Sequence, residues 1–363
     1  MSKQADKVKE AMKEVEAVPE EKFSRKNFLS SGSTLLNMAL SGNPFGGFQK
    51  GCYYYLVGDS SSGKTFLSLT CFAEATIHPS FKKHRLIYDN VENGALMNME
   101  KFFGKTMADK LESPAKTPEG ADKNSDTIED FYYNFDDAIK DGRPFIYVLD
   151  SMDSLTSEKE AEEFTEGKKL NRAGKEGKGS YGDGKAKKNS SGMRVLVNKL
   201  QKTDSIFIMI SQTRDNIGFG FEKKTRSGGR ALKFYATCEI WSSIVGTISK
   251  TVKGIKRNIG KELELAIKKN RQTGREWKVR TTIYPSYGID DMESCVEYLI
   301  TEGVWKGSKA KMEAPELEYK GSMSKLIDKI EEEGLESKVR GLVGSTWMAI
   351  EEACSHKRKK RYD

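Results

Sequence analysis

The chain has 363 residues, 31% of them charged, and a formal net charge of +8. This length allows one large domain with appendages or two domains, and the charge suits a polyanionic partner as well as an ordinary soluble protein. No window approaches the roughly 18 apolar residues of a membrane span, and residues 1–23 lack the apolar centre of a signal peptide. We therefore expect a cytoplasmic protein with no membrane segment.

The cysteine and histidine patterns argue against disulfides and structural zinc. The five cysteines are odd in number, far apart and mostly inside apolar runs, which predicts reduced, buried thiols. The three histidines have no ligand-like spacing.

The amino-terminal part of the chain predicts a short amphipathic helix. Within residues 4–17, Val8, Met12 and Val15 follow helical spacing, and Pro19 ends the pattern. This helix is too small to fold alone. It either contacts another protomer or covers the core of its own subunit.

From about residue 33 to 290, short apolar runs alternate with helical patterns. This alternation predicts βαβ units and a largely parallel sheet. The predicted strands are residues 53–58, 85–89, 144–150 and 205–211, and the helical patterns include 66–76 and 193–202. The chain from residue 324 onward predicts helices and ends in the basic run "HKRKKRYD".

Residues 58–65, "GDSSSGKT", fit the phosphate-loop pattern G-x-x-x-x-G-K-[ST] between a predicted strand and a predicted helix. Glycines let backbone N–H groups turn toward phosphates at a helix N-terminus. The pattern predicts an ATP and Mg²⁺ site in which Lys64 neutralises phosphate charge and Thr65 ligates the metal. The nucleotide-binding residues are Gly58, Asp59, Ser60, Ser61, Ser62, Gly63, Lys64 and Thr65.

Carboxylates at neighbouring strand ends complete the predicted site. Asp150 ends the strand "PFIYVLD", and we expect it to share the magnesium ion with Thr65. Asp89 and Glu92 follow the strand "RLIYD", at the edge where open α/β sheets place their sites. We expect Glu92 to be the general base. The alternative is that either acid caps the following helix.

Residues 165–192 have eight lysines and arginines, three acids, seven glycines and almost nothing apolar. Such a segment cannot pack into a core, so its composition predicts a solvated, disordered insertion.

Two stretches resemble the RecA/RadA family of DNA recombinases, which includes phage relatives such as UvsX. The first is the lead-in to the phosphate loop, residues 30–65, and the second is residues 205–237, "SIFIMISQTRDNIGFGFEKKTRSGGRALKFYAT". The resemblance implies a RecA-like α/β ATPase core over residues 33–290, with a mainly parallel sheet flanked by helices. An amino-terminal helix and linker (1–32) would precede it, and a small α-rich domain (291–363) would follow.

The resemblance also assigns residues that bind DNA. A first flexible basic loop at about 158–192 would use Lys168, Lys169 and Arg172. A second loop at 214–229 would contact phosphates and bases, although its composition also fits a plain surface loop. The residues assigned to this second region are Arg214, Phe219, Phe221, Lys223, Lys224, Arg226, Gly228, Gly229 and Arg230.

Three catalytic assignments follow from the resemblance alone. Gln212 would sense the γ-phosphate and couple it to the loop behind it. Lys269 and Arg271, in "LELAIKKNRQTG", would reach the nucleotide of a neighbouring subunit as trans-acting fingers. Without the resemblance, both are ordinary cations at a strand end.

The resemblance implies a homologous-recombination ATPase that forms a helical filament on single-stranded DNA, pairs it with duplex DNA and exchanges strands. Single-strand-binding and mediator proteins are further possible partners. A DNA motor or mediator without strand exchange is the main alternative, and a filament protein with weak hydrolysis is a third. Three features depart from the family: the longer spacing from Asp89 to Glu92, the basic carboxyl-terminal tail, and Asp59 with three serines in the phosphate loop. Compact size and likeness to UvsX suggest a phage-encoded protein acting in the bacterial host cytoplasm.

Overall fold

The computed structural model describes residues 26–92, 97–172, 183–215, 224–226, 229–356 and 358. In this part of the chain, no helix combines the length and apolarity needed to cross a bilayer. The helix predicted within residues 4–17 lies outside the described residues.

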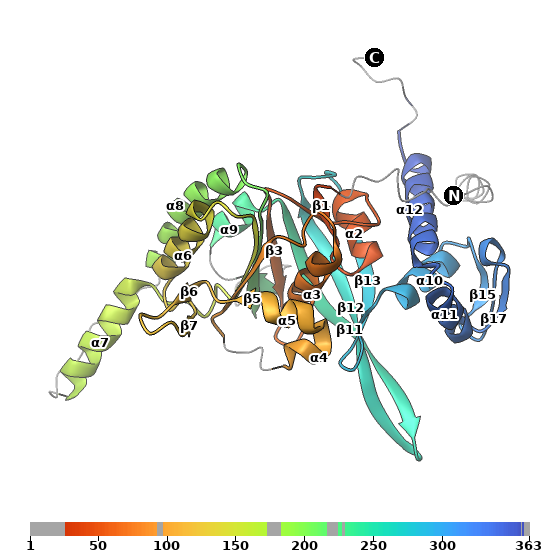
Figure 1. Cartoon of the computed structure of the whole chain (residues 1–363), viewed down its shortest axis with the longest axis horizontal. Helices are drawn as coiled ribbons and strands as arrows, with labels where there is room; N and C mark the ends of the chain where they lie inside the picture. The colour runs from red at the N-terminus through yellow and green to blue at the C-terminus, as the bar shows by residue number, and fades with distance from the viewer. Residues whose placement is uncertain are drawn as a thin grey trace.

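A ten-stranded sheet forms the centre of the described chain (Figure 1). Its order is β14-β13-β12-β11-β3-β9-β8-β4-β5, with β10 paired to β9. Neighbours from β11 through β5 run parallel, whereas β11 to β14 run antiparallel. The α/β class and the mainly parallel sheet are therefore confirmed. The strands are β3 (Tyr53–Gly58), β4 (Arg85–Asn90), β5 (Leu111–Glu112), β8 (Phe145–Asp150), β9 (Ile206–Asp215), β10 (Lys224–Arg226), β11 (Cys238–Val252), β12 (Ile255–Asn270), β13 (Lys278–Tyr284) and β14 (Gly288–Asp290).

Consecutive apolar residues form the central strands because helices cover both faces of the parallel part of the sheet. β3 and β8 are buried at every position. Along β3, Tyr54 and Leu56 belong to one core, whereas Tyr53 and Tyr55 belong to the core on the opposite face. α2 (Thr34–Ser41) and α3 (Lys64–Ile77) contribute to the first core, and α6 (Ile128–Lys140) and α8 (Asp183–Leu200) to the second (Figure 1).

Shorter elements surround the sheet. β1 pairs with β2, and Leu29 of β1 is fully buried in the first core, so the packed region begins before the expected boundary at residue 33. These shorter elements are β1 (Phe28–Leu29), β2 (Phe48–Gln49), α4 (Met99–Phe103), α5 (Lys105–Lys110), β6 (Ala115–Lys116), β7 (Asp122–Lys123), α7 (Glu158–Arg172) and α9 (Arg230–Tyr235).

β11 and β12 form a long antiparallel hairpin that projects from the sheet (Figure 1). Its turn places Lys253 at φ 51° and Gly254 at φ 76°. Positive φ at both turn residues matches the right-handed twist of the flanking strands. The base of the hairpin lies in the sheet, whereas residues 249–259 are largely exposed.

The carboxyl-terminal region is α-rich, as expected, but its core is continuous with the first core of the central sheet. Asp291 accepts hydrogen bonds from the backbone nitrogen and hydroxyl of Thr34 at 2.6 and 2.7 Å, and from Arg340 Nε at 3.1 Å. These bonds join α2, α10 and α12. The region contains α10 (Asp291–Thr301), β15 (Lys306–Ser308), β16 (Lys311–Ala314), the 3-10 helix Pro315–Leu317, β17 (Tyr319–Gly321), α11 (Met323–Glu332) and α12 (Glu336–Ala353).

The prediction of a flexible loop over residues 158–192 is wrong at both ends of this range, because both ends are helical. Residues 158–172 form α7, and residues 183–192 begin α8. The stretch "EKEAEEF" that opens α7 consists mostly of strong helix formers, and the last residues of the Lys/Gly-rich run continue into the apolar helix pattern of "MRVLVNKL". Residues 173–182 between the two helices lie outside the described residues.

Candidate nucleotide site

The loop between β3 and α3 can be built only with glycine at two of its positions. A Cβ on Gly58 would lie 2.4 Å from the Ser242 carbonyl oxygen, and Gly63 has φ +83°. Gly63 caps α3 without a side-chain hydrogen bond, so no side chain occupies the N–H groups of the first turn. The N-terminus of a 14-residue helix and its free N–H groups fit a phosphate.

Lys64 folds back over this loop. Its Nζ donates to the carbonyl oxygens of Gly58 at 2.9 Å and Asp59 at 2.6 Å, and contacts Ser62 Oγ at 3.5 Å. Burial lowers the pKa of Lys64, and nearby carboxylates, Asp150 first among them, partly oppose this change. The ammonium group is therefore a preformed charge held by neutral acceptors, which phosphate oxygens can replace.

Thr65 and Asp150, the two predicted magnesium ligands, are in direct contact. Thr65 Oγ1 donates to Asp150 Oδ2 at 2.6 Å, and the Tyr88 hydroxyl donates to the same oxygen at 3.0 Å. Burial raises the pKa of Asp150, whereas the hydrogen bond from Thr65 lowers it. A hydroxyl and a carboxylate beside a phosphate cradle are hard oxygen donors that fit Mg²⁺.

Glu92 lies at the same edge of the sheet, despite its unusual spacing. Its Oε1 accepts from Gln212 Nε2 at 2.9 Å and from Ser154 Oγ at 3.4 Å, and it also accepts from the Ser151 hydroxyl. The backbone nitrogen of Glu92 donates to the Asp150 carbonyl oxygen at 3.1 Å. The structure thus brings the predicted general base and the predicted γ-phosphate sensor into direct contact.

Asp89 has a different environment and does not face these residues. It is fully buried, and it accepts from the backbone nitrogen and hydroxyl of Ser125 at 2.9 and 2.6 Å and from the Tyr147 hydroxyl at 2.7 Å. Burial raises the pKa of Asp89. The carboxylate therefore anchors the segment that precedes α6, and it is neither a site residue nor a helix cap.

Several residues of this network, and the contact that Asp59 makes with Thr213, were not predicted. Asp153 Oδ2 accepts from the backbone nitrogen of Gln212 at 2.7 Å, and Asp59 accepts a hydrogen bond from the Thr213 hydroxyl. Ser151, Asp153 and Ser154 all lie within four residues after Asp150 in "LDSMDSL". Polar residues at the end of a buried strand could therefore have been included in the predicted site. No local signal pairs Asp59 with Thr213, because they are 154 residues apart.

Lys269 and Arg271 lie far from this loop. Lys269 Nζ donates to the carbonyl oxygens of Lys233 at 2.6 Å and Phe234 at 2.8 Å, and Arg271 Nη2 donates to the Phe234 carbonyl at 2.8 Å. These carbonyls belong to the last turn of α9, where cations are favoured by the helix dipole. Burial, followed by repulsion from Arg271, lowers the pKa of Lys269 to about 8.

The predicted DNA-binding residues fall into three groups. Lys168 is exposed on α7, the helix that also contains Lys169 and Arg172. Arg214 on β9 pairs in antiparallel register with Thr225 of β10, the strand that also contains Lys224 and Arg226. Gly229 caps α9 and Arg230 begins it. Phe219, Phe221, Lys223 and Gly228 lie outside the described residues.

Comparisons with known proteins agree on one family. Residues 123–290 match the family model of the RecA N-terminal domain. Protein RecA of Cytophaga hutchinsonii is 28% identical over 281 residues, which cover 76% of this chain and 69% of that protein. Protein RecA of Rhizobium leguminosarum is 27% identical over 288 residues, 78% of this chain and 71% of that protein. Protein RecA of Chlorobaculum parvum is 30% identical over 224 residues, 58% and 53% of the two chains.

The matched region contains Asp150, Gln212, Lys269 and Arg271, whereas the phosphate loop precedes it. These three relatives are bacterial, so the finer likeness to phage UvsX, and with it a phage origin, stays a prediction.

Proposed function

We propose that this chain is a RecA-family protein and that it is an ATP-dependent recombination protein that assembles on single-stranded DNA, pairs it with a homologous duplex and exchanges strands. The observation that carries the proposal is the hydrogen bond between Glu92 and Gln212 at the edge of the phosphate loop. It links the group that would activate water to the strand that leads into the predicted DNA loop.

Each residue of the site has a role in ATP hydrolysis. The N–H groups at the start of α3 bind phosphate oxygens, and Lys64 neutralises their charge. Thr65 and Asp150 would hold Mg²⁺, which supplies Lewis-acid stabilisation of phosphate charge when bound. The Glu92 carboxylate orients a water molecule and accepts its proton, and Ser151 and Gln212 hold that carboxylate in place.

The same contacts support coupling to DNA. Gln212 and Thr213 lie on β9, two residues and one residue before Arg214, where the predicted DNA loop begins. Thr213 bonds to Asp59 of the phosphate loop. A change in the phosphate loop therefore reaches the start of the DNA loop through two adjacent side chains.

The far end of that loop leads to the proposed trans-acting fingers. α9 begins at Arg230, directly after the loop, and Lys269 and Arg271 bind carbonyl oxygens near its end. We propose that these cations contact the nucleotide of a neighbouring protomer in the assembled filament. In this proposal α9 connects the predicted DNA loop, which precedes it in the sequence, to Lys269 and Arg271, which bind its carbonyl oxygens.

Strand exchange is tested by mixing the purified chain with circular single strands, homologous linear duplex, ATP and Mg²⁺. We expect joint molecules, and we expect none with Lys64→Ala. The matched control is Lys101→Ala, which removes an exposed lysine from α4 and should retain the activity. DNA-stimulated ATP hydrolysis without joint molecules would instead support a DNA motor or mediator.

A further inference from the structure

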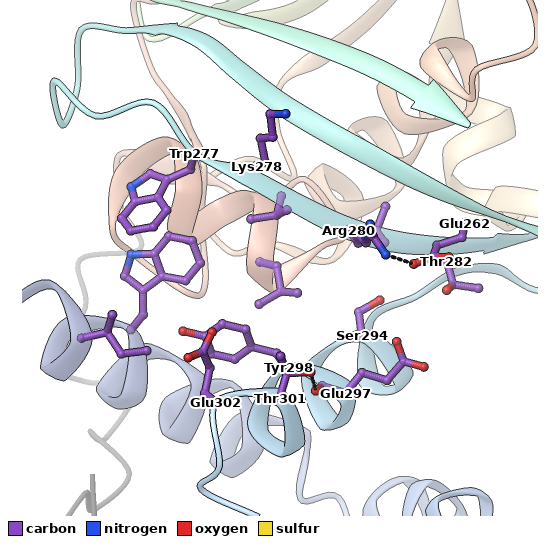
Figure 2. Close-up of a pocket in the computed structure, with 15 residues that line it drawn as sticks. Glu262, Trp277, Lys278, Arg280, Thr282, Ser294, Glu297, Tyr298, Thr301 and Glu302 are labelled. Carbon is purple, nitrogen blue, oxygen red and sulfur yellow. Dashed lines mark hydrogen bonds and ion pairs between the residues drawn. The ribbon is translucent and has the colours of Figure 1, made fainter. Parts of the chain in front are cut away.

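A cavity of about 400 Å³ lies between β13 and the helices α10 and α12, away from the nucleotide site (Figure 2). Residues of the ATPase sheet line one side, and residues of the carboxyl-terminal region line the other. None of the residues assigned above to nucleotide or DNA lines it. Its chemistry therefore needs a separate explanation.

Three aromatic rings form one wall of the cavity. The ring centroids of Trp277 and Trp347 are 4.7 Å apart, and those of Tyr298 and Trp347 are 5.9 Å apart with stacked planes. All three residues line the cavity. The faces of such rings attract lysine and arginine side chains.

A carboxylate without a cation lies beside these rings. Figure 2 shows Glu302 next to Tyr298. Among the described residues Glu302 has no ion pair, whereas the other two lining acids do, Glu297 with Lys309 and Glu262 with Arg280. Glu302 is half-buried, and burial raises its pKa. A cation in the cavity would favour the ionised form of this partly dehydrated carboxylate.

The basic end of the chain begins close to this cavity. Trp347 and Ile350 of α12 line it, and α12 ends at Ala353. Arg275 bonds to Glu351 at 3.2 Å and holds this end of α12 to the turn before β13. Residues 357–361 are all lysine or arginine. The ten residues from 354 to 363 can span about 30 Å when extended, which is several times the distance of one helical turn back to Ile350.

We propose that the basic segment 356–363 folds back on its own chain and places a lysine or arginine side chain in this cavity, against Glu302 and the three rings. Charge complementarity and the exit point of α12 select this occupant. Docking itself is independent of the proposed function. One consequence rests on that function: a docked segment withholds its cations from DNA.

Zero-length carbodiimide cross-linking of the full chain, mapped by mass spectrometry, tests the contact directly. We expect cross-links from Glu302 to Lys357, Lys359 or Lys360, and we expect Glu302→Gln to remove them. The matched control is Glu332→Gln, which changes an exposed acid on α11 and should leave the cross-links intact. Lysines of this segment that react equally with acids all over the surface would overturn the proposal.

The same experiment identifies which copy supplies the segment. Isotopically heavy and light chains are mixed before cross-linking. Cross-links that join only peptides of one isotope composition support docking within one chain. Mixed heavy–light cross-links at Glu302 would show a second copy as the occupant and would overturn the proposal in the form stated.

A binding measurement on a full-length variant is a second, independent test. In this variant all five cations of residues 357–361 are replaced by glutamine, which leaves the cavity free. A synthetic peptide of residues 355–363 should then change the tryptophan emission in a saturable way, because Trp277 and Trp347 line the cavity. Adding Glu302→Gln should weaken binding about tenfold, as expected for loss of one partly dehydrated charge contact. Equal affinity with and without Glu302→Gln would contradict the proposal.

Discussion

The two edges of the central sheet differ in how completely one chain satisfies their polar groups. At the carboxyl ends of β3, β8 and β9, Lys64, Asp150 and Glu92 all have side-chain partners within the chain. At the opposite edge, Lys269 and Arg271 bind carbonyl oxygens of α9, and no carboxylate of the described chain lies within ion-pair distance of either.

Register places these two edges well apart. Gly58 pairs with Ser242 on β11, whereas Lys269 pairs with Glu239, three residues nearer the start of that strand. Three strand residues span about 10 Å, and a further strand lies between. The fingers therefore cannot serve the phosphate loop of their own chain without a large rearrangement. The difference between the edges supports the proposal that one half of the site is preassembled within the chain, whereas the proposed fingers act on a neighbouring protomer.

The preassembled edge is tested most severely by Glu92→Gln. The change removes the negative charge but keeps an oxygen that can accept from Ser151 and Gln212. We expect ATP hydrolysis to fall about 10²- to 10⁴-fold, the range for loss of a general base, while nucleotide affinity changes little. Turnover and ATP binding are measured separately. Glu100→Gln, on the exposed surface of α4, is the control. Turnover within twofold of the unchanged chain would show that another group activates water.

The incomplete edge is tested by mixing two inactive variants. Lys64→Ala disables a chain's own loop, and Lys269→Ala disables its finger. In a one-to-one assembly, about a quarter of the interfaces combine an intact loop with an intact finger from the next protomer, because a head-to-tail contact joins unlike surfaces. We expect ATP hydrolysis to recover to about that fraction. A mixture as inactive as its components would show that the finger acts within its own chain, or not at all.

Lys268→Ala provides the control for the mixing experiment. Lys268 is exposed and adjacent in sequence, but it has no hydrogen bond to α9 among the described contacts. Its replacement should leave hydrolysis intact without mixing. A loss equal to that of Lys269→Ala would indicate a general effect of charge on this strand.

The preassembled edge was also the more predictable one. Eight contiguous residues define the phosphate loop, and a buried strand ends in Asp150, the predicted metal ligand, so both predictions follow from local patterns. Glu92 and Asp89 differ in their position relative to the buried strand β4. Asp89 is still inside β4 and has three buried donors, whereas Glu92 is past its end.

The rest could not be predicted because long-range packing decides it. Asp59 and Thr213 meet only because β3 and β9 are neighbours in the sheet. Composition favoured disorder for residues 165–192, yet helices extend into this segment from both ends. The contact between α2 and the carboxyl-terminal region could not be predicted either, because Thr34 and Asp291 are 257 residues apart in the sequence.

The pH dependence of hydrolysis can show whether Lys269 acts as a charged finger. Burial and Arg271 lower the pKa of Lys269 to about 8, with Lys233 adding to this effect and Glu239 opposing it. We expect turnover of the assembled protein to fall severalfold as the pH rises through about 8, because Lys269 loses its proton. Lys269→Arg should remove this decline, since arginine stays charged. A decline that persists in Lys269→Arg would assign it to another group.

Stability should respond to the same titration with the opposite sign. The pKa of Lys269 in the fold is about 8, below its ordinary value of 10.5, so the unfolded chain binds more protons between these pH values. The contribution of Lys269 to the free energy of unfolding therefore rises with pH across this window. Denaturant titrations at pH 7.5 and 9.5 should show a smaller rise for Lys269→Ala than for the unchanged chain. The same rise in both would contradict the assigned pKa direction.

The smallest expected effect concerns the link between the two loops, Asp59 and Thr213. Thr213→Val keeps the shape of the side chain but removes the donor to Asp59. One hydrogen bond is worth about 1 kcal/mol, so we expect the stimulation of ATP hydrolysis by single-stranded DNA to fall about two- to fivefold. Thr251→Val, on the exposed part of the β11–β12 hairpin, is the matched control.

The measured quantity is the ratio of turnover with DNA to turnover without it. This ratio separates coupling from catalysis, because loss of the proposed general base Glu92 lowers both rates together. If Thr213→Val leaves the ratio unchanged, the Asp59–Thr213 bond does not couple the phosphate loop to the predicted DNA loop, and Gln212 is the proposed connection that remains. If the ratio falls, the bond between Thr213 and Asp59 is a second connection. The phosphate loop and the predicted DNA loop are then coupled through both Gln212 and Asp59.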